Sequence, residues 1–298
     1  MKIILSRKGF DSTLRFGGGP SPIFGDKRLL SLPIPEDTRK NTIRYSEVSD
    51  PSGHFPSLGP IVKQLTAERP TADERLTGDS FAHLDPDLRR SSFPRSEGWR
   101  PVFGQEGGPQ THLCNQGVGV GDLFLFYGLY QNVEVDKDTI RFVRGSQRMH
   151  VIWGWMTIGE KRKISSEMDD PEWARYHAHY TDKRSQNNAV YIAADKSFGK
   201  FPGAGVFESY SPKLCLTDLK QKPVRHSWWG LPLWFEPRKG RFPLTHHPTE
   251  HPYWTQQQDQ VLLKTKSPGQ EYVLDTEFYP EGEQWAESFI AEGTRINS

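Results

Sequence analysis

The sequence predicts an α+β fold with a mixed or antiparallel β-barrel-like core, short helices and long loops. Two apolar segments, residues 121–127 and 150–158, are hydrophobic on both faces of a strand. Their aromatic and β-branched residues, bounded by glycines, are typical of central strands. Glycine and proline, 27 and 23 of 298 residues, favour abundant loops between the regular elements.

Shorter strands and helices complete the predicted fold. Residues 1–6 alternate as a strand, and three further strands are predicted over 139–143, 188–193 and 270–274. The helical patterns are short and lie at residues 61–68, 85–90, 169–175, 214–219 and 283–291. The pattern at 169–175 includes an acidic N-cap and a proline at the first helical position.

No repeat and no long linker divides the chain. Residues 36–100 are polar and interrupted by prolines, unlike the apolar segments that follow them. We therefore expect a single domain of residues 1–298, in which residues 36–100 form an insertion or a lid over the substrate.

Composition excludes several classes of protein. The chain has 38 Lys+Arg against 37 Asp+Glu, so contact with nucleic acid has to come from a local patch. No apolar run approaches the roughly 20 residues that span a membrane, and the first one is too short for a signal peptide. With Cys114 and Cys215 as its two cysteines, the chain has no disulfide framework. We expect a cytoplasmic protein that does not contact membranes.

A candidate phosphate site follows the first strand. Arg7 and Lys8 lie beside Gly9, with Asp11 in the same turn and the glycines 17–19 shortly after it. Exposed amides and two cations suit a phosphate. The spacing is neither a P-loop nor a dinucleotide fingerprint. The alternative is a solvated strand end with ordinary surface charges.

A polar loop over residues 104–115 leads into the first apolar segment. Gln105 and Asn115 can donate and accept hydrogen bonds, as the edge of a nucleobase requires. Glu106 or His112 could transfer a proton. The alternative is a connector whose amides bind their own backbone.

A His-x-His pair, His177 and His179, is the next candidate. If this segment is extended, both rings point to one side and could converge on a phosphate, a substrate or a metal. If it is helical, the rings diverge by roughly 200°. A metal would need a third ligand, such as Asp182, Glu106 or a residue of 245–251. The spacing matches no standard zinc pattern, so no metal is expected.

Two further segments contribute candidates near the C-terminus. The Trp-rich residues 226–235 offer Trp228 as a stacking platform for an unpaired base, although packing in the core is the alternative. Gln270 and Glu271 place an amide and a carboxylate at the start of the last strand. Asn187 precedes the strand at 188–193 and adds another polar edge.

Together these segments resemble the third type of the nucleotide modification associated domain. The resemblance is carried by residues 1–11, 20–24, 30–35, 104–107, 119–126, 150–154, 176–179, 231–235 and 269–275. It implies a role in modifying DNA bases, with DNA or a nucleotide as substrate and other base-modifying enzymes as partners. It names no cofactor. Ala178 stands where the family pattern has proline, which weakens the argument for an extended His-x-His segment.

A more distant likeness leads to a second hypothesis. Residues 121–126 and 153–160 are similar to barrel strands of PUA-like domains, a likeness of fold that does not fix function. The first hypothesis is an enzyme, of the transferase type, acting on a base or nucleotide that a partner has already altered. The second is a non-catalytic module that recognises a modified or flipped base through Trp228 or Trp229.

The first hypothesis divides the candidate residues by role. It assigns phosphate binding to Arg7 and Lys8, base recognition to Gln105, Asn115 and Asn187, and proton transfer to Glu106, His112, His177 or His179.

Overall fold

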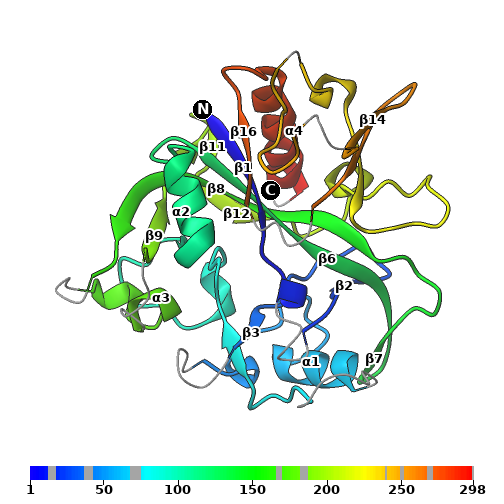
Figure 1. Ribbon diagram of the computed structural model, residues 1–298. Coiled ribbons are helices and arrows are strands. Elements are labelled where there is room, and N and C mark those ends of the chain that lie inside the picture. Colours follow the sequence, from blue (N-terminus) through cyan, green and yellow to red (C-terminus); the bar gives the residue numbers. More distant parts are fainter. Residues whose placement is uncertain are drawn as a thin grey trace.

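A nine-stranded mixed sheet forms the centre of the molecule (Figure 1). The computed structural model describes residues 1–12, 18–36, 43–67, 75–165, 170–181, 187–238, 240–248, 252–266 and 271–296. The main path of the sheet is β16-β1-β6-β8-β9-β5, and three short strands pair with its long members: β2 and β7 with β6, and β12 with β8.

The strands of this sheet come from both ends and the middle of the chain. They are β1 (Lys2–Arg7), β2 (Ser21–Ile23), β5 (Val102–Gln105), β6 (Leu123–Asp136), β7 (Thr139–Phe142), β8 (Met149–Lys163), β9 (Ala189–Ala193), β12 (Ala204–Val206) and β16 (Glu271–Asp275). Three small sheets surround it: β3 (Ile34–Glu36) with β4 (Phe81–His83), β10 (Lys196–Ser197) with β11 (Phe201–Pro202), and β13 (Trp228–Leu231) with β15 (Val261–Lys264) and β14 (Trp254–Gln256).

Helices are few in the described part of the chain. The α-helices are α1 (Leu58–Thr66), α2 (Gly107–Asn115), α3 (Ala178–Thr181) and α4 (Glu281–Ile296). Short 3-10 turns cover Phe10–Ser12, Tyr45–Glu47, Arg90–Ser92, Glu172–Ala174, Pro212–Leu214 and Leu233–Phe235. None of these helices is both long enough and apolar enough to cross a membrane.

The two predicted central strands form the middle of the sheet. β6 and β8 are antiparallel and contain the apolar segments at residues 121–127 and 150–158, which are buried on both faces. β1 lies parallel to β6 and antiparallel to β16, so the sheet is mixed. The predicted α+β class with a mixed β core is thereby confirmed.

The barrel-like closure is not confirmed. The path through the sheet is open, with β16 and β5 as its two end strands. Within the described residues no backbone ladder joins these two strands. Their side chains nevertheless meet, because Gln105 at the end of β5 donates a hydrogen bond to Glu271 at the start of β16.

The core of the described residues consists of one small hydrophobic cluster, formed by Val102, Ile164, Ala174, Tyr180, Val190 and Ile192, and two larger ones. One surrounds β1, β6 and β8 and includes Phe289 and Ile290 of α4. The other contains Phe10, Ile61 and Val62 together with other side chains of residues 10–84, packed against the β6–β7 hairpin. In Figure 1, α1 and β3 lie below the sheet, and α4 lies above it. Ser57 caps α1 by accepting a hydrogen bond from the Gly59 amide.

Two predicted helices are wrong. Residues 85–90 are not helical, because the backbone of Asp87 pairs with Val102 through both of its hydrogen bonds. Of residues 214–219, Leu214 ends a 3-10 turn and residues 215–218 are extended, with bridges from Cys215 to Val151 and from Thr217 to Trp229. Of the other predicted helices, 283–291 lies within α4, whereas 169–175 contains a single 3-10 turn.

Candidate functional site

A hollow of about 710 Å³, open mouth included, lies between the central sheet and residues 29–92. Lys8 and Trp153 line it from the sheet. His83, Asp85 and Asp87 line it from the segment that follows β4. Much of the remaining wall is apolar, contributed by leucines 29, 30, 32, 58, 84 and 88. Such a hollow, with apolar walls and a few grouped charges, has the character of a small-molecule site.

The first polar cluster of this hollow is centred on Lys8. Its ammonium lies 3.5 Å from Glu271 Oε1 and 5.1 Å above the ring of Phe103. Gln105 donates a hydrogen bond to the same carboxylate oxygen. Burial raises the pKa of Glu271, although Lys8, Ser6 and Gln105 oppose that rise. Three predicted site residues, Lys8, Gln105 and Glu271, therefore meet in one place.

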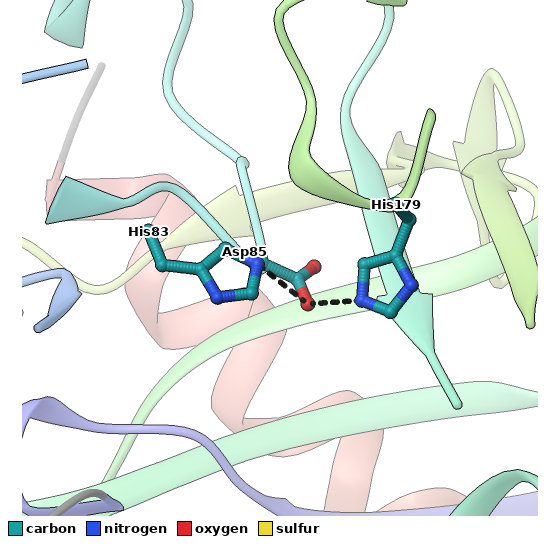
Figure 2. Close-up of side chains that lie close together, drawn as sticks. All are labelled: His83, Asp85 and His179. Carbon is teal, nitrogen blue, oxygen red and sulfur yellow. Dashed lines mark ion pairs between the residues drawn. The ribbon is translucent and has the colours of Figure 1, made fainter. Parts of the chain in front are cut away.

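The second polar cluster is centred on Asp85, which follows β4. Its Oδ2 atom lies 3.4 Å from Nε2 of His179 and 3.8 Å from Nε2 of His83. Its Oδ1 atom lies 3.5 Å from Nε2 of His177 and accepts a hydrogen bond of 2.7 Å from the Gly104 amide. Figure 2 shows His83 and His179 on either side of the carboxylate. Segments that are far apart in the sequence thus supply one compact group of titratable side chains.

Burial and charge shift the pKa values in this second cluster in opposite directions. Burial alone would raise the pKa of Asp85, but the adjacent imidazoles of His177 and His179 outweigh it and hold the pKa well below its usual range. Burial would lower the pKa of His179, but Asp85 and Asn188 raise it above normal. For His177, burial prevails over Asp85 and its pKa is lowered. Separated pKa values of this kind are typical of catalytic sites.

The His-x-His segment matches neither geometry considered from the sequence. α3 begins at Ala178, so the segment is partly helical, yet the ring centroids of His177 and His179 are only 5.7 Å apart. His177 precedes the first helical residue and is therefore not bound by the helical 100° step. Both rings consequently turn toward Asp85.

Gly104 makes room for His179. A Cβ atom at residue 104 would lie 2.1 Å from the Cδ2 atom of the His179 ring, closer than two carbon atoms can approach. The ring therefore packs directly on the backbone of β5. Glu106, two residues further along the chain, lies near enough for its charge to raise the pKa of His179.

Arg7 and Asp11 are not among the described residues that line the hollow. Successive residues of a strand point to opposite faces, so Arg7 lies on the face opposite to Lys8. There its guanidinium binds Asp11 at 2.5 Å and lies near Tyr127 and Tyr272. The predicted phosphate site is thus divided, and Lys8 is the cation that faces the hollow.

Four other predicted residues also lie away from the described lining. His112 contacts Thr245 and packs on His246. Asn115 is exposed at the end of α2, and Asn187 binds Thr111 at the surface. Trp228 is covered by the cations of Arg225 and Lys264. Gln270, Asp182, Glu250 and His251 lie outside the described residues.

Sequence reasoning missed His83, Asp85 and Asn188. The signal for the first two was the run His83-Leu84-Asp85-Pro86-Asp87, which places two potential ligands on one side of an extended segment. The helix predicted over 85–90 concealed it. Asn188 adjoins the predicted Asn187, but its side chain points inward and binds His179.

Comparison with known proteins assigns the chain to a family. No curated protein and no solved structure matches the chain, so the PUA-like likeness has no support. The family model described as nucleotide modification associated domain 3 matches residues 2–275. The match extends from β1 to the last residue of β16 and includes both polar clusters of the hollow. The chain therefore belongs to the nucleotide modification associated domain 3 family, and its role is related to nucleotide modification.

Proposed function

We propose that this protein is an enzyme that modifies a nucleobase or nucleotide bound in the hollow between the sheet and residues 29–92. The observation that carries the proposal is that Lys8 and Asp85 line the same hollow. Lys8 supplies a buried cation, and Asp85 supplies a carboxylate that contacts two imidazoles. A site that holds only a base has no need of such a group, whereas proton transfer does.

The lining suggests how a nucleotide would lie. The leucine-rich wall suits the faces of a base, and the Lys8 ammonium suits a phosphate oxygen. In this arrangement Asp85, which lines the hollow, would exchange a proton with the substrate, and His179, which is not among the described lining residues, would support it through its contact with Asp85. Gln105 and Glu271 would hold Lys8 in place, and Glu106 would support the charge on His179.

We assign the reaction to the transferase type, acting on a base or nucleotide that another enzyme has already altered. The support is chemical: the hollow offers groups that move protons beside a cation that can hold a phosphate, as group transfer requires. Residues 36–100 would cover the substrate as a lid within a single domain of residues 1–298. The part of them that is described already supplies one wall of the hollow.

Nucleoside analysis of cells tests the proposal. DNA and the free nucleotide pool would be digested and compared by mass spectrometry in cells with the wild-type gene, no gene or an Asp85→Asn variant. We expect one modified nucleoside that is present with the wild type and absent in the other two. Lys220→Ala, which removes an exposed ion pair with Asp259, is the matched control and should keep it.

An unchanged nucleoside profile would contradict the proposal. If DNA and the nucleotide pool are unchanged when the gene is removed, the protein is not a base-modifying enzyme. Preferential binding of a modified over an unmodified oligonucleotide would then show the non-catalytic recognition module, which is the alternative function. Its predicted stacking residue, Trp228, would be the residue to substitute next.

A further inference from the structure

We propose that His83, Asp85 and His179 bind a divalent transition-metal ion beside the hollow. The ion would border the hollow that we assign to the substrate, because His83 and Asp85 line it, but the proposal rests on ligand geometry and its test measures bound metal. The tests of the two proposals can therefore give different results, although a bound ion would occupy the atoms of Asp85 and His179 that the proposed function uses in proton transfer. It departs from the expectation, based on sequence spacing, that no metal is bound.

The three ligand groups lie close to the required spacing. One ring nitrogen of His83, one carboxylate oxygen of Asp85 and one ring nitrogen of His179 all lie within 4.8 Å of one another. An ion at about 2.1 Å from three ligands holds any two of them about 3.4–3.6 Å apart. The distances of 3.4 and 3.8 Å from Asp85 Oδ2 to the two Nε2 atoms are close to this, and the farthest pair would have to close by up to about 1.3 Å (Figure 2).

The hydrogen bonds of His179 leave Nε2 available as a ligand. Asn188 donates through Nδ2 to the backbone carbonyl of His179, which fixes the orientation of the amide. Its Oδ1 atom then faces Nδ1 of His179 at 2.7 Å, so Nδ1 carries a proton. In the neutral ring, Nε2 therefore presents a lone pair toward Asp85. Most metal-bound histidines are oriented in this way by a second partner.

The ring of His83 is also oriented through its Nδ1 atom, here by a carboxylate. Its Nδ1 atom lies 2.9 Å from Oε2 of Glu36, which can only accept a hydrogen bond when ionised. Its Nε2 atom is buried and has no hydrogen-bond partner among the described residues. This ring, too, presents a lone pair toward Asp85.

Hydrogen bonds alone do not explain the distances between Asp85 and the two histidines. Charge-assisted hydrogen bonds between nitrogen and oxygen measure about 2.7–2.9 Å, whereas Oδ2 of Asp85 lies 3.4 and 3.8 Å from the two Nε2 atoms. Two lone pairs that face one carboxylate oxygen repel it, and a metal ion bound between them would remove that repulsion. Oδ1 is already held by the Gly104 amide and lies beside His177, so Oδ2 is the oxygen left for an ion.

The ligand set defines the class of metal. Two imidazoles and one carboxylate favour Zn²⁺ or Fe²⁺ over Mg²⁺ or Ca²⁺, which prefer oxygen ligands. Three protein ligands leave coordination positions open, and His83 and Asp85 both line the hollow. A substrate atom or a water molecule could take such a position, as in catalytic rather than structural metal sites.

Metal analysis of the full-length chain, purified without a metal-binding tag, tests the proposal. We expect about one Zn²⁺ or Fe²⁺ per chain, and less than about 0.1 in His83→Ala and His179→Ala. His54→Ala is the matched control, because His54 is exposed and outside the hollow, and it should retain the metal. Asn188→Leu should weaken metal affinity by about 10–100-fold because it removes the partner of Nδ1.

A second measurement decides the matter if the alanine variants do not fold. Co²⁺ would be titrated into the metal-free wild-type chain, whose folding is checked by circular dichroism, and we expect visible absorption bands that saturate at about one equivalent. A folded wild-type chain that contains no metal and gives no such bands would overturn the proposal. Unchanged metal content in a folded His83→Ala chain would do the same.

Discussion

Gln105 and Glu271 lie on the two end strands of the nine-stranded sheet, and a buried hydrogen bond joins their side chains. The same carboxylate forms an ion pair with Lys8, which follows β1. One buried carboxylate thus joins segments from the beginning, middle and end of the chain. Because Lys8 lines the hollow, the contact that holds the end strands together also positions the cation of the proposed site.

Breaking the ion pair between Lys8 and Glu271 should destabilise the fold. Glu271→Gln leaves the buried Lys8 ammonium without its counter-charge, and Lys8→Met leaves Glu271 without its own. We expect either change to lower the free energy of unfolding by about 3–5 kcal/mol. The double variant Lys8→Met/Glu271→Gln should lose much less than the sum, because it leaves no unpaired charge. Urea unfolding of the four proteins gives the coupling directly.

An exposed ion pair provides the control for this cycle. Lys220 and Asp259 are both solvent-exposed, and Lys220→Ala should change the free energy of unfolding by less than about 1 kcal/mol. If the two single losses simply add in the double variant, Lys8 and Glu271 are not energetically coupled. The role assigned to Glu271 would then be wrong.

Gly104→Ala should disrupt the Asp85 cluster without removing any of its side chains. The new methyl group would overlap the His179 ring, so the ring has to leave its place on β5. We expect a loss of about 1–3 kcal/mol in stability, measured by urea unfolding, together with loss of the modified nucleoside.

A glycine with free space beside it is the matched control for that change. A Cβ atom at Gly108, in α2, meets nothing within 4 Å, so Gly108→Ala should fold and act as the wild type does. Full activity of Gly104→Ala, with normal stability, would show that the position of the His179 ring is unimportant.

The central strands could be predicted because burial on both faces leaves an uninterrupted apolar pattern. Residues 121–127 and 150–158 carry that pattern, and both lie in the middle of the sheet. The helix at 283–291 was likewise visible through its amphipathic spacing. The extended backbone around residues 215–217 could not be predicted from local pattern, because it pairs with residues of other strands through Cys215–Val151 and Thr217–Trp229 bridges.

The candidate site could be predicted only in part, for a related reason. Arg7 and Lys8 are neighbours in sequence, but the alternation of a strand sends them to opposite sides of the sheet. Conversely, His83 and His179 are far apart in sequence and meet at Asp85. Sequence patterns show local periodicity, whereas contacts between residues far apart in sequence depend on the tertiary fold.

The two thiols should differ strongly in reactivity. Burial raises the pKa of Cys215 to about 11, whereas Cys114 is exposed on α2. At pH 7.5 a thiol with a pKa near 11 is less than about 0.1% thiolate, the reactive form. Iodoacetamide should therefore alkylate Cys114 in the native chain and reach Cys215 only after urea is added, as peptide mass spectrometry would show.

Replacing Cys114 leaves Cys215 as the one thiol that can be labelled. Cys114→Ser should leave the native chain unlabelled and the unfolded chain with one label. Labelling of Cys215 at the same rate in the native and unfolded chains would contradict the burial that the structure gives it.

Acid should destabilise the fold through His247. Its Nε2 atom accepts a hydrogen bond from the Lys266 amide, and its Nδ1 atom lies 2.9 Å from the Thr245 carbonyl, so the ring is held in its neutral form. Burial, with the nearby His246 and Lys266, lowers its pKa to about 4. In the unfolded chain the same ring titrates near its ordinary value of 6.5.

The direction of the effect follows from these two values. Between pH 6.5 and 4 the unfolded chain binds the extra proton, so this contribution to stability is complete above pH 6.5 and is lost as the pH falls through the window. It amounts to about 3.4 kcal/mol at most. Urea unfolding at pH 7.5, 6 and 5 should show the decline, and His247→Gln should reduce its slope. His54→Ala, a change at an exposed histidine, should leave the slope as it is. The same slope in His247→Gln as in the wild type would assign the acid sensitivity to other groups.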